Sequence, residues 1–424
     1  FIQAAAHRPV FPTDMTREER VKVSKYYDLA AEIPEVEWSD SLWHLPLADI
    51  VKKQGGPDSI YDNMIRREPN DPDWYTGGLF HEDMSPGFGA PALWFISWYD
   101  ISISPNLALV NHVRANAEDP DVANNQFTVI SPVLHCGFSR GGKDIMVGER
   151  LMKDAGFHTN TLVNRWFDFW LKGKDNDVVE ETPKVQYFTM GINEWRSSAA
   201  WPPENAEMVT FYLDSDGEAN SVFGDGRLTM DKPEAEDNPD AFTYDPHYPV
   251  PMNGGGFCCL GSKYEAGAFD QRQIEARDDV LVYSTEPLKE GIEITGPVEI
   301  TLFVSSDAKD TDFTVKLVDV YPDGPAYNIC DTIQRVRYRE GYGKEVFMEE
   351  GVVYEVPVST MNTSNYFAPG HQIRIEVSSS NFPRYARNLN TGGNNTTETH
   401  AVKAHNKVHH SSTYPSQIRV SVIK

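Results

Sequence analysis

The hydrophobic pattern of this 424-residue chain changes character at about Met208. Before that point, Pro91–Ser97 and Phe127–Ile130 are continuous apolar runs, which are typical of strands buried on both faces of a sheet. After it, short runs such as Val298–Val304 and Gln417–Val422 alternate apolar and polar residues, so one face of each strand is buried and the other is wet. The pattern predicts an α/β region followed by an all-β sandwich, which we expect to be a jelly roll.

Helix signals separate the two buried runs and follow the second one. A helix is expected at 106–116, and residues 160–172 place large apolar side chains at helical spacing. Gly173 follows directly and is a predicted C-terminal cap of that second helix. The order strand, helix, strand, helix indicates a doubly wound sheet.

The first 88 residues lack strong strand signals. They predict helices at Thr16–Ala31, where Thr16 and Glu19 form a capping box, and at 41–54. Because single hydrophobic cores stop growing at about 250–300 residues, we expect more than one domain. The predicted division is a helical region at 1–88, an α/β region at 89–205 and an all-β region at 206–424.

The chain is strongly acidic, with 63 acidic and 38 basic residues and a formal net charge of −25. Such a surface repels nucleic acid and anionic lipid, and no run of 18 apolar residues is present, so neither a nucleic acid nor a membrane is an expected partner. The four cysteines form no C-x-x-C pair and are expected to be reduced. The compartment and the oligomeric state, a homo-oligomer included, are left open by these features.

Two groups of residues invite a metal assignment, and we expect neither to bind one. Adjacent histidines in a strand point to opposite faces and chelate poorly, and carboxylates in turns are usually surface groups. The groups are His405 with His409 and His410, and Asp307 with Asp310 and Asp312.

The best candidates for chemistry are Asp100 and His135. Asp100 comes just after the first buried run, and His135 follows the second by a few residues. Ligands of open α/β sheets bind beyond the carboxyl ends of the strands, where an aspartate can orient a histidine that acts as a general base. Each residue alone is as easily a turn or structural group. Together, in this order, they match the second and third members of the series Ser, Asp, His.

The nucleophilic serine is the missing member of that series. One literal G-x-S-x-G match is present, at Gly137–Gly141, with Ser139 at its centre. It follows His135 and has no separate strand before it, so the strained nucleophile turn is not expected there. The chain starts with Phe1 rather than methionine. We therefore expect the serine, and the oxyanion hole with it, to lie upstream of residue 1.

At Trp98-Tyr99-Asp100 and His135 the chain resembles the X-Pro dipeptidyl-peptidase and bacterial cocaine esterase family of serine hydrolases, which includes the α-amino-acid ester hydrolases. The similarity is spread over roughly residues 90–424, and such spread is far more specific than a lone motif. Its further segments are Arg165–Gly173, Val185–Gly191, Asp279–Leu288, Asp310–Phe313, Asp319–Gly324 and Val377–Arg384.

The resemblance implies a partial α/β-hydrolase core (89–205), a helical cap (1–88) and a C-terminal jelly-roll β-sandwich (206–424). It implies catalytic roles for Asp100 and His135 and no cofactor. It also implies substrate contacts for Trp98 and Tyr99 beside the aspartate. Phe257, in the tract Gly254–Phe257, matches a stretch that approaches the acyl pocket in this family.

The predicted function is hydrolysis of a small ester or amide through an acyl-enzyme. The serine would come from a missing N-terminal segment or from a companion chain, so residues 1–424 alone are expected to be inactive. One alternative is a non-catalytic hydrolase scaffold whose jelly roll binds a ligand such as a carbohydrate. Another makes Ser139 an unusual nucleophile.

Overall fold

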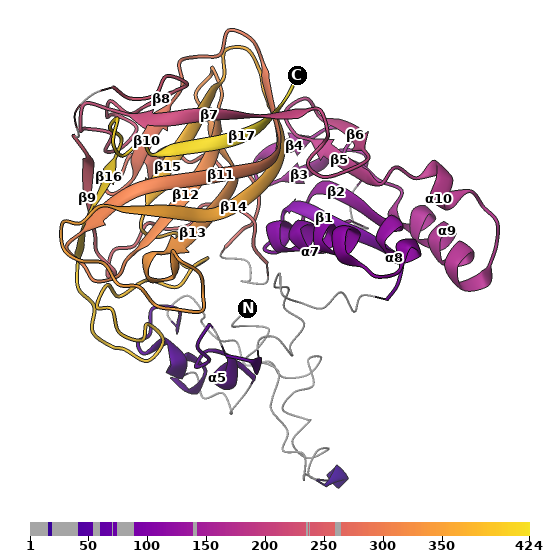
Figure 1. Cartoon of the computed structure of the whole chain (residues 1–424), viewed down its shortest axis with the longest axis horizontal. Coiled ribbons are helices and arrows are strands. Elements are labelled where there is room, and N and C mark those ends of the chain that lie inside the picture. Colours follow the sequence, from indigo (N-terminus) through magenta and orange to yellow (C-terminus); the bar gives the residue numbers. More distant parts are fainter. Residues whose placement is uncertain are drawn as a thin grey trace.

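The computed structural model describes residues 16–18, 41–53, 60–69, 71–73, 89–138, 142–234, 236, 238–258 and 264–424. It contains a small mixed sheet and a large β-sandwich that lie side by side (Figure 1). Most of the predicted helix Thr16–Ala31, and the motif residue Ser139, lie outside the described residues.

The small sheet has the strand order β1-β2-β5-β6. Its strands are β1 (Ala92–Tyr99), β2 (Gln126–Leu134), β5 (Val185–Thr189) and β6 (Glu194–Ser198). The first three run parallel, and β6 pairs with β5 antiparallel. Strand β2 lies between two parallel neighbours and is buried along almost its whole length, as a continuous apolar run requires.

Helices pack against this sheet. They are α7 (Ile103–Asn116), α8 (Pro120–Asn124), α9 (Thr159–Lys172) and α10 (Val178–Glu181). Helix α7 buries Leu107, Val110 and Val113 at helical spacing. On α9, Trp166 packs edge-on against Phe127 of β2, with ring centroids 5.3 Å apart. A hairpin of β3 (Ile145–Val147) and β4 (Arg150–Met152) lies between β2 and α9 in the sequence.

Gly173 ends α9 in the left-handed conformation, with φ of +64°, which confirms its predicted role as a cap. The start of α7 differs from the prediction by one turn. The pattern indicated 106–116, whereas the helix begins at Ile103. The difference has a local reason, because Pro105 is tolerated within the first turn of a helix, where its missing N–H group needs no partner.

The sandwich is built from one sheet of 11 strands in the described part of the chain, with the order β13-β12-β15-β10-β8-β7-β17-β11-β16-β9 and with β14 paired to β11. Neighbouring strands pair antiparallel except at β8 and β10. The strands are β7 (Ala206–Asp214), β8 (Arg227–Thr229), β9 (Asp240–Tyr244), β10 (Leu281–Ser284), β11 (Ile292–Ser306), β12 (Asp312–Val320), β13 (Ala326–Arg335), β14 (Tyr354–Phe367), β15 (Gln372–Ser378), β16 (Ala404–His409) and β17 (Gln417–Ile423), with short helices α11 (Arg272–Glu275) and η2 (Val336–Tyr338) between them.

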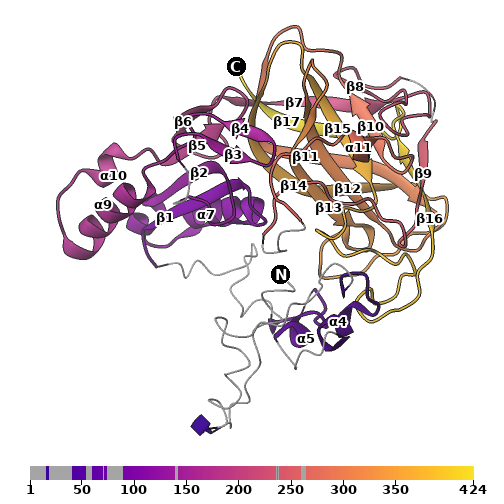
Figure 2. The same ribbon diagram turned by 180° about the vertical axis from the view of Figure 1, so that it is seen from behind.

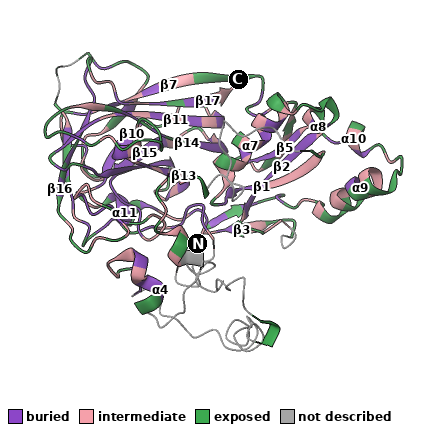
Figure 3. Cartoon of the chain, turned by 60° about the horizontal axis from the view of Figure 1, so that its bottom comes forward, coloured by how far each residue is buried: buried purple, intermediate pink, exposed green. Residues whose placement is uncertain are grey.

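The inner faces of the sandwich form a hydrophobic core that continues into the small sheet. Phe242 of β9 and Phe313 of β12 pack edge-on inside it. Buried residues also run along β14 and β15 of the sandwich (Figure 3). The same cluster includes Ile96 and Trp98 of β1. Main-chain hydrogen bonds of Met190, just after β5, with β14 join the two units directly. The β-sandwich expected from the alternating pattern is therefore present.

Described residues between 41 and 69 contact loops of the sandwich (Figure 2). They form η1 (Leu47–Asp49), α4 (Ile50–Lys53) and α5 (Ile60–Met64). Trp43 packs on Phe382 with ring centroids 4.7 Å apart, and the guanidinium of Arg387 lies over both rings. The expected helix at 41–54 is thus a turn, a short 3-10 segment and one turn of α-helix, because Pro46 precedes η1 and cannot continue a helix.

Candidate active site

Asp100 and His135 meet at one edge of the small sheet. Tyr99, the last residue of β1, pairs with Leu134, the last residue of β2, and each candidate follows directly. Parallel strands end at the same edge, so the two side chains leave it side by side. Oδ2 of Asp100 lies 2.7 Å from Nδ1 of His135. The structure therefore brings together two residues that stand 35 positions apart in the sequence.

The two side chains differ in their access to solvent. The aspartate side chain is 10% exposed and the histidine side chain 38% exposed. A buried carboxylate on Nδ1 holds the proton there and leaves Nε2 as the acceptor. Nε2 of His135 has no hydrogen-bond partner among the described residues. In this geometry Nε2 of His135 can accept a proton from a group that is brought within hydrogen-bond distance of it.

Trp98 and Tyr99 lie directly before Asp100, and both are almost completely buried. Nε1 of Trp98 donates to the carbonyl of Phe188 at 2.7 Å, and the hydroxyl of Tyr99 donates to the carbonyl of Asn328 at 3.0 Å. Burial raises the pKa of the Tyr99 hydroxyl, which therefore stays protonated. Main-chain carbonyls thus occupy both polar groups. The predicted substrate contacts of Trp98 and Tyr99 stay a prediction.

The tract Gly254–Phe257 of the sandwich region approaches Asp100 from the other side. A Cβ atom placed on Gly256 would lie 2.8 Å from the carbonyl oxygen of Asp100, so this close approach requires glycine. Phe257 follows and is buried, with 4% of its surface exposed. The tract reaches the predicted site, and the contact of Phe257 with a substrate stays a prediction.

A cavity of about 170 Å³ lies at the seam between the small sheet and the sandwich. Trp98 of β1 and Asp100 directly after it line one side, and Gly256, Asp331 and Arg384 line it from the sandwich. Nη1 of Arg384 forms a buried ion pair with Asp331. Sequence reasoning missed this pair. Arg384 ends the similarity segment Val377–Arg384 but was given no role there, Asp331 stands in no such segment, and the two meet only through the fold.

A second serine, aspartate and histidine group lies inside the sandwich. The hydroxyl of Ser215 is 2.9 Å from Nε2 of His410, and it also donates to Asp240 at 2.8 Å. Asp240 contacts the same Nε2 at 3.1 Å rather than Nδ1, and the hydroxyl of Tyr283 donates to it at 2.7 Å. The carboxylate thus competes with the histidine for the serine proton and does not orient the ring from behind. All four residues are buried, so this group is a structural network.

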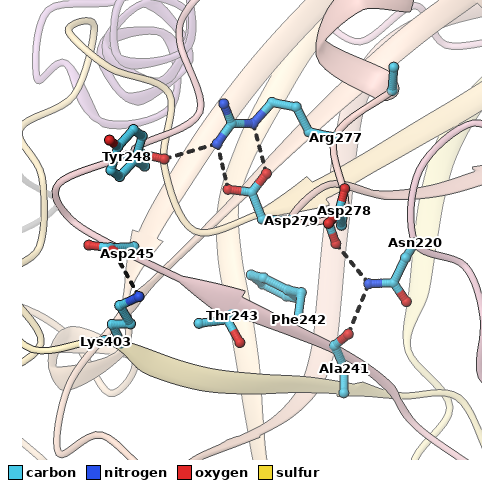
Figure 4. A pocket seen from close by; sticks show the side chains of 11 residues that line it. Asn220, Ala241, Phe242, Thr243, Asp245, Tyr248, Arg277, Asp278, Asp279 and Lys403 are labelled. Atoms are coloured by element: carbon cyan, nitrogen blue, oxygen red, sulfur yellow. Dashed lines mark hydrogen bonds and ion pairs between the residues drawn. The ribbon is translucent and has the colours of Figure 1, made fainter.

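A wider groove of about 660 Å³ opens on the surface of the sandwich (Figure 4). Two ion pairs occupy its wall, one between Arg277 and Asp279 at 2.7 Å and one between Lys403 and Asp245 at 3.1 Å. Asn220 donates to the main-chain carbonyls of Ala241 and Asp278. These ion pairs occupy four of the charged side chains of the lining, and the carboxylate of Asp278 has no ion pair among the described residues.

The structure gives no metal assignment within the described residues, where no group of three or more His, Cys, Asp or Glu side chains is arranged around an ion. Asp310 and Asp312, named above as a metal candidate, instead pair with Arg337 and Arg335. His409 donates to or accepts from Ser305 at 2.9 Å. No helix in the described ranges has the length and apolar character needed to cross a bilayer.

Comparison with known proteins identifies the family. The family model for the "X-Pro dipeptidyl-peptidase C-terminal non-catalytic domain" matches residues 176–419, which is more than half of the chain. The chain belongs to the X-Pro dipeptidyl-peptidase and cocaine esterase family. The matched range holds the sandwich and Phe257, whereas Asp100 and His135 precede it.

Relatives of this family extend the match toward the N-terminus. A cocaine esterase of Rhodococcus sp. (strain MB1 Bresler) is 39% identical over 367 residues, which are 86% of this chain and 62% of that protein. The chain therefore spans less than two thirds of this relative's length. An aminopeptidase of a marine sediment archaeon, Thaumarchaeota archaeon, shares 27% identity and a TM-score of 0.69 over 79% of this chain and 55% of that one.

An α-amino acid ester hydrolase has a similar fold, with 23% identity and a TM-score of 0.72 over 92% of this chain and 65% of that one. At this identity the likeness concerns the fold alone. The resemblance expected from Trp98-Tyr99-Asp100 and His135 is confirmed by the family match and these relatives.

Proposed function

We propose that residues 1–424 belong to a serine hydrolase that cleaves an ester or amide bond through an acyl-enzyme. The observation that carries the proposal is the 2.7 Å contact between Asp100 and Nδ1 of His135 at the ends of two parallel strands. In this role the small sheet is the C-terminal half of an α/β-hydrolase core, and the sandwich is its jelly roll. The esterase named among the relatives supports hydrolysis as the reaction class.

The proposed reaction needs no cofactor. A serine attacks the carbonyl carbon, and Nε2 of His135 takes the hydroxyl proton as the C–O bond forms. Asp100 holds the ring in the right tautomer and stabilises the imidazolium. His135 then delivers the proton to the leaving alcohol or amine. Water attacks the acyl-enzyme by the same route and releases the acid.

We place the nucleophilic serine upstream of Phe1, in the same polypeptide or in a companion chain. The order Ser, Asp, His of this hydrolase fold supports that placement, since the serine precedes the other two along the chain. Nε2 of His135 is without a partner among the described residues, as a base that awaits a nucleophile would be. Residues 1–424 without that serine are then inactive.

Labelling with a fluorophosphonate probe tests this proposal. The intact protein that contains residues 1–424 is treated with the probe, and the labelled peptide is mapped by mass spectrometry. We expect the label on a serine that precedes Phe1, and we expect His135→Gln to remove it while the protein stays folded. A label on Ser139, abolished by Ser139→Ala, would replace the upstream serine with the unusual nucleophile.

The same labelling experiment also tests the alternative of a non-catalytic scaffold. If folded, intact protein takes no label on any serine, the hydrolase proposal is wrong. The groove of Figure 4 would then be the first place to seek binding, by titration with carbohydrates.

A further inference from the structure

The second oxygen of the Asp100 carboxylate is held by a single neighbouring residue. Oδ1 of Asp100 accepts one hydrogen bond from the main-chain N–H of Ser102 and another from its hydroxyl, each at 2.9 Å. Oδ2 contacts His135 at 2.7 Å. Since both oxygens have partners on different sides, the carboxylate cannot rotate about its last bond without losing contacts.

Ser102 occupies the N-cap position of α7 but does not use its side chain to cap the helix. An N-cap serine normally accepts a hydrogen bond from a main-chain N–H group in the first turn of its helix. The Ser102 side chain makes no such capping bond. Its hydroxyl donates to Asp100 instead and accepts a hydrogen bond from Nδ2 of Asn106 at 2.9 Å.

Asn106 lies one turn into α7, four residues after Ser102, and thus faces it along the helix. Its amide group can only donate to Ser102 through Nδ2, so the serine proton is left for Asp100. The helix therefore supplies a short chain of hydrogen bonds, from Asn106 through Ser102 and Asp100 to His135.

We propose that Ser102 is a positioning residue of the relay, which fixes the Asp100 carboxylate so that Oδ2 holds the proton on Nδ1 of His135. This inference rests on the hydrolase function proposed above. Ser102 acts through Asp100 and need not touch the substrate. The main-chain N–H of residue 102 is retained in alanine and threonine variants, so these variants report on the hydroxyl alone.

The tautomer of His135 tests the inference directly. The intact protein is labelled with ¹⁵N-histidine, and His135→Gln assigns the resonances of its two ring nitrogens. We expect Nδ1 to carry the proton in the parent protein, and Ser102→Ala to move part of the population to the Nε2-protonated form, because a freer carboxylate holds Nδ1 less well. Ser102→Thr retains the hydroxyl and should restore the parent spectrum.

Ser104→Ala is the matched control. Ser104 is on the same turn of α7, but its hydroxyl accepts from Nδ2 of Asn362 at 3.1 Å and has no contact with Asp100. It should leave the ring nitrogens of His135 unchanged. An unchanged spectrum in folded Ser102→Ala protein would overturn the inference. An equal change in Ser104→Ala would do so too, since it would point to general loosening of the helix.

Kinetics on the unlabelled intact enzyme give a second measurement, once the probe has identified its serine. Ser102→Ala should lower kcat roughly tenfold with little change in KM, because a misaligned base affects the chemical step more than binding. Ser102→Thr should recover most of the loss. If the fluorophosphonate finds no serine, the hydrolase proposal fails while the tautomer measurement still decides whether Ser102 positions the pair.

Discussion

His135 and His410 each contact an aspartate, and the ring nitrogen involved separates their roles. Asp100 contacts Nδ1 of His135 and leaves Nε2 open, which is the arrangement of a proton relay. Asp240 contacts Nε2 of His410, the same atom that faces Ser215. Residue types alone would rank the second group higher, since it contains a serine. The contacts show that the second group is not a relay, because its aspartate and its serine face the same ring nitrogen.

Replacement of Asp100 by asparagine should test the relay at the level of one atom. The amide retains the shape of the carboxylate but cannot hold the proton on Nδ1 in the same way. We expect the hydrolytic rate to fall by roughly 10⁴-fold, with little loss of stability. Asp154→Asn, at an exposed carboxylate paired with Lys143, is the control and should leave the rate unchanged. Rates with an ester substrate and thermal melts of both variants give the answer.

The pH dependence of stability should report on the buried His410–Asp240 pair. Burial alone would lower the pKa of His410, but the hydrogen bond and charge of Asp240 outweigh it and raise that pKa. Burial alone would raise the pKa of Asp240, but hydrogen bonds from His410, the N–H of Ala219 and the hydroxyl of Tyr283 hold it below its usual value. The two shifts favour the charged pair.

The sign of each contribution follows from linkage. The His410 contribution is complete below its unfolded pKa of about 6.5 and is lost as pH rises through the higher folded value. The Asp240 contribution is present above its unfolded pKa of about 3.9 and is lost as pH falls through the lower folded value. The difference in free energy of unfolding between the parent protein and His410→Gln should therefore be largest between about pH 4 and 6.5 and shrink above that range. A difference that stays constant from pH 5 to 9 would contradict this prediction.

At the scale of elements, helix α9 shows how local chemistry sets a boundary. Gly173 takes φ of +64°, and its N–H and that of Lys174 donate to carbonyls of the last helical turn at 3.0 Å each. This left-handed cap is available to glycine without strain. The sequence alone predicted it, because glycine after a run of helical spacing is a strong stop signal.

Gly173→Ala should destabilise the protein by about 1 kcal/mol through backbone strain. No atom lies within 4 Å of the position that the new Cβ would take, so a steric clash does not contribute. Gly343→Ala is the matched control, since its surroundings are equally open and its backbone does not have a positive φ. It should change the free energy of unfolding by less, in either direction. Chemical denaturation gives the free energy of unfolding of both variants, and the difference between them separates the effect of backbone strain from that of the added methyl group.

At the scale of the whole molecule, one unit is the small sheet with the β3–β4 hairpin that contacts its strand β2, and the other is the sandwich. The two units share buried polar contacts as well as a core. Arg150 of β4 donates to Oδ1 of Asn365 on β14 at 3.2 and 3.3 Å and lies 3.6 Å from Asp319 on β12. Asp319 also contacts Nδ1 of His371 at 2.7 Å. These side chains are mostly or fully buried. The arginine therefore joins the two units through a charge that water cannot replace.

Arg150→Met should destabilise the protein by about 3–5 kcal/mol, because it removes the guanidinium from beside the buried Asp319 and from its hydrogen bonds with Asn365. We also expect the small sheet and the sandwich to separate into two unfolding steps, which calorimetry would show. Arg419→Met removes an exposed pair with Glu299 and should cost no more than about 1 kcal/mol. Equal effects of the two substitutions would mean that the buried contact does not couple the units.

The sequence by itself determined the features that depend on short stretches of chain. The periodicity of apolar residues distinguished the buried strand β2 from the alternating strands of the sandwich. The placement of Asp100 and His135 after successive buried strands predicted that their side chains meet. Parallel strands share an edge, so strand order along the chain is enough for that inference.

Only the tertiary structure decided which distant groups pair. The order of the 11 strands, the Arg384–Asp331 pair beside Asp100, and the contact of Trp43 with Phe382 bring together residues tens to hundreds of positions apart. Periodicity carries no information about such partners, because every alternating strand can pair with many others at similar energy. Their choice depends on how the whole core packs.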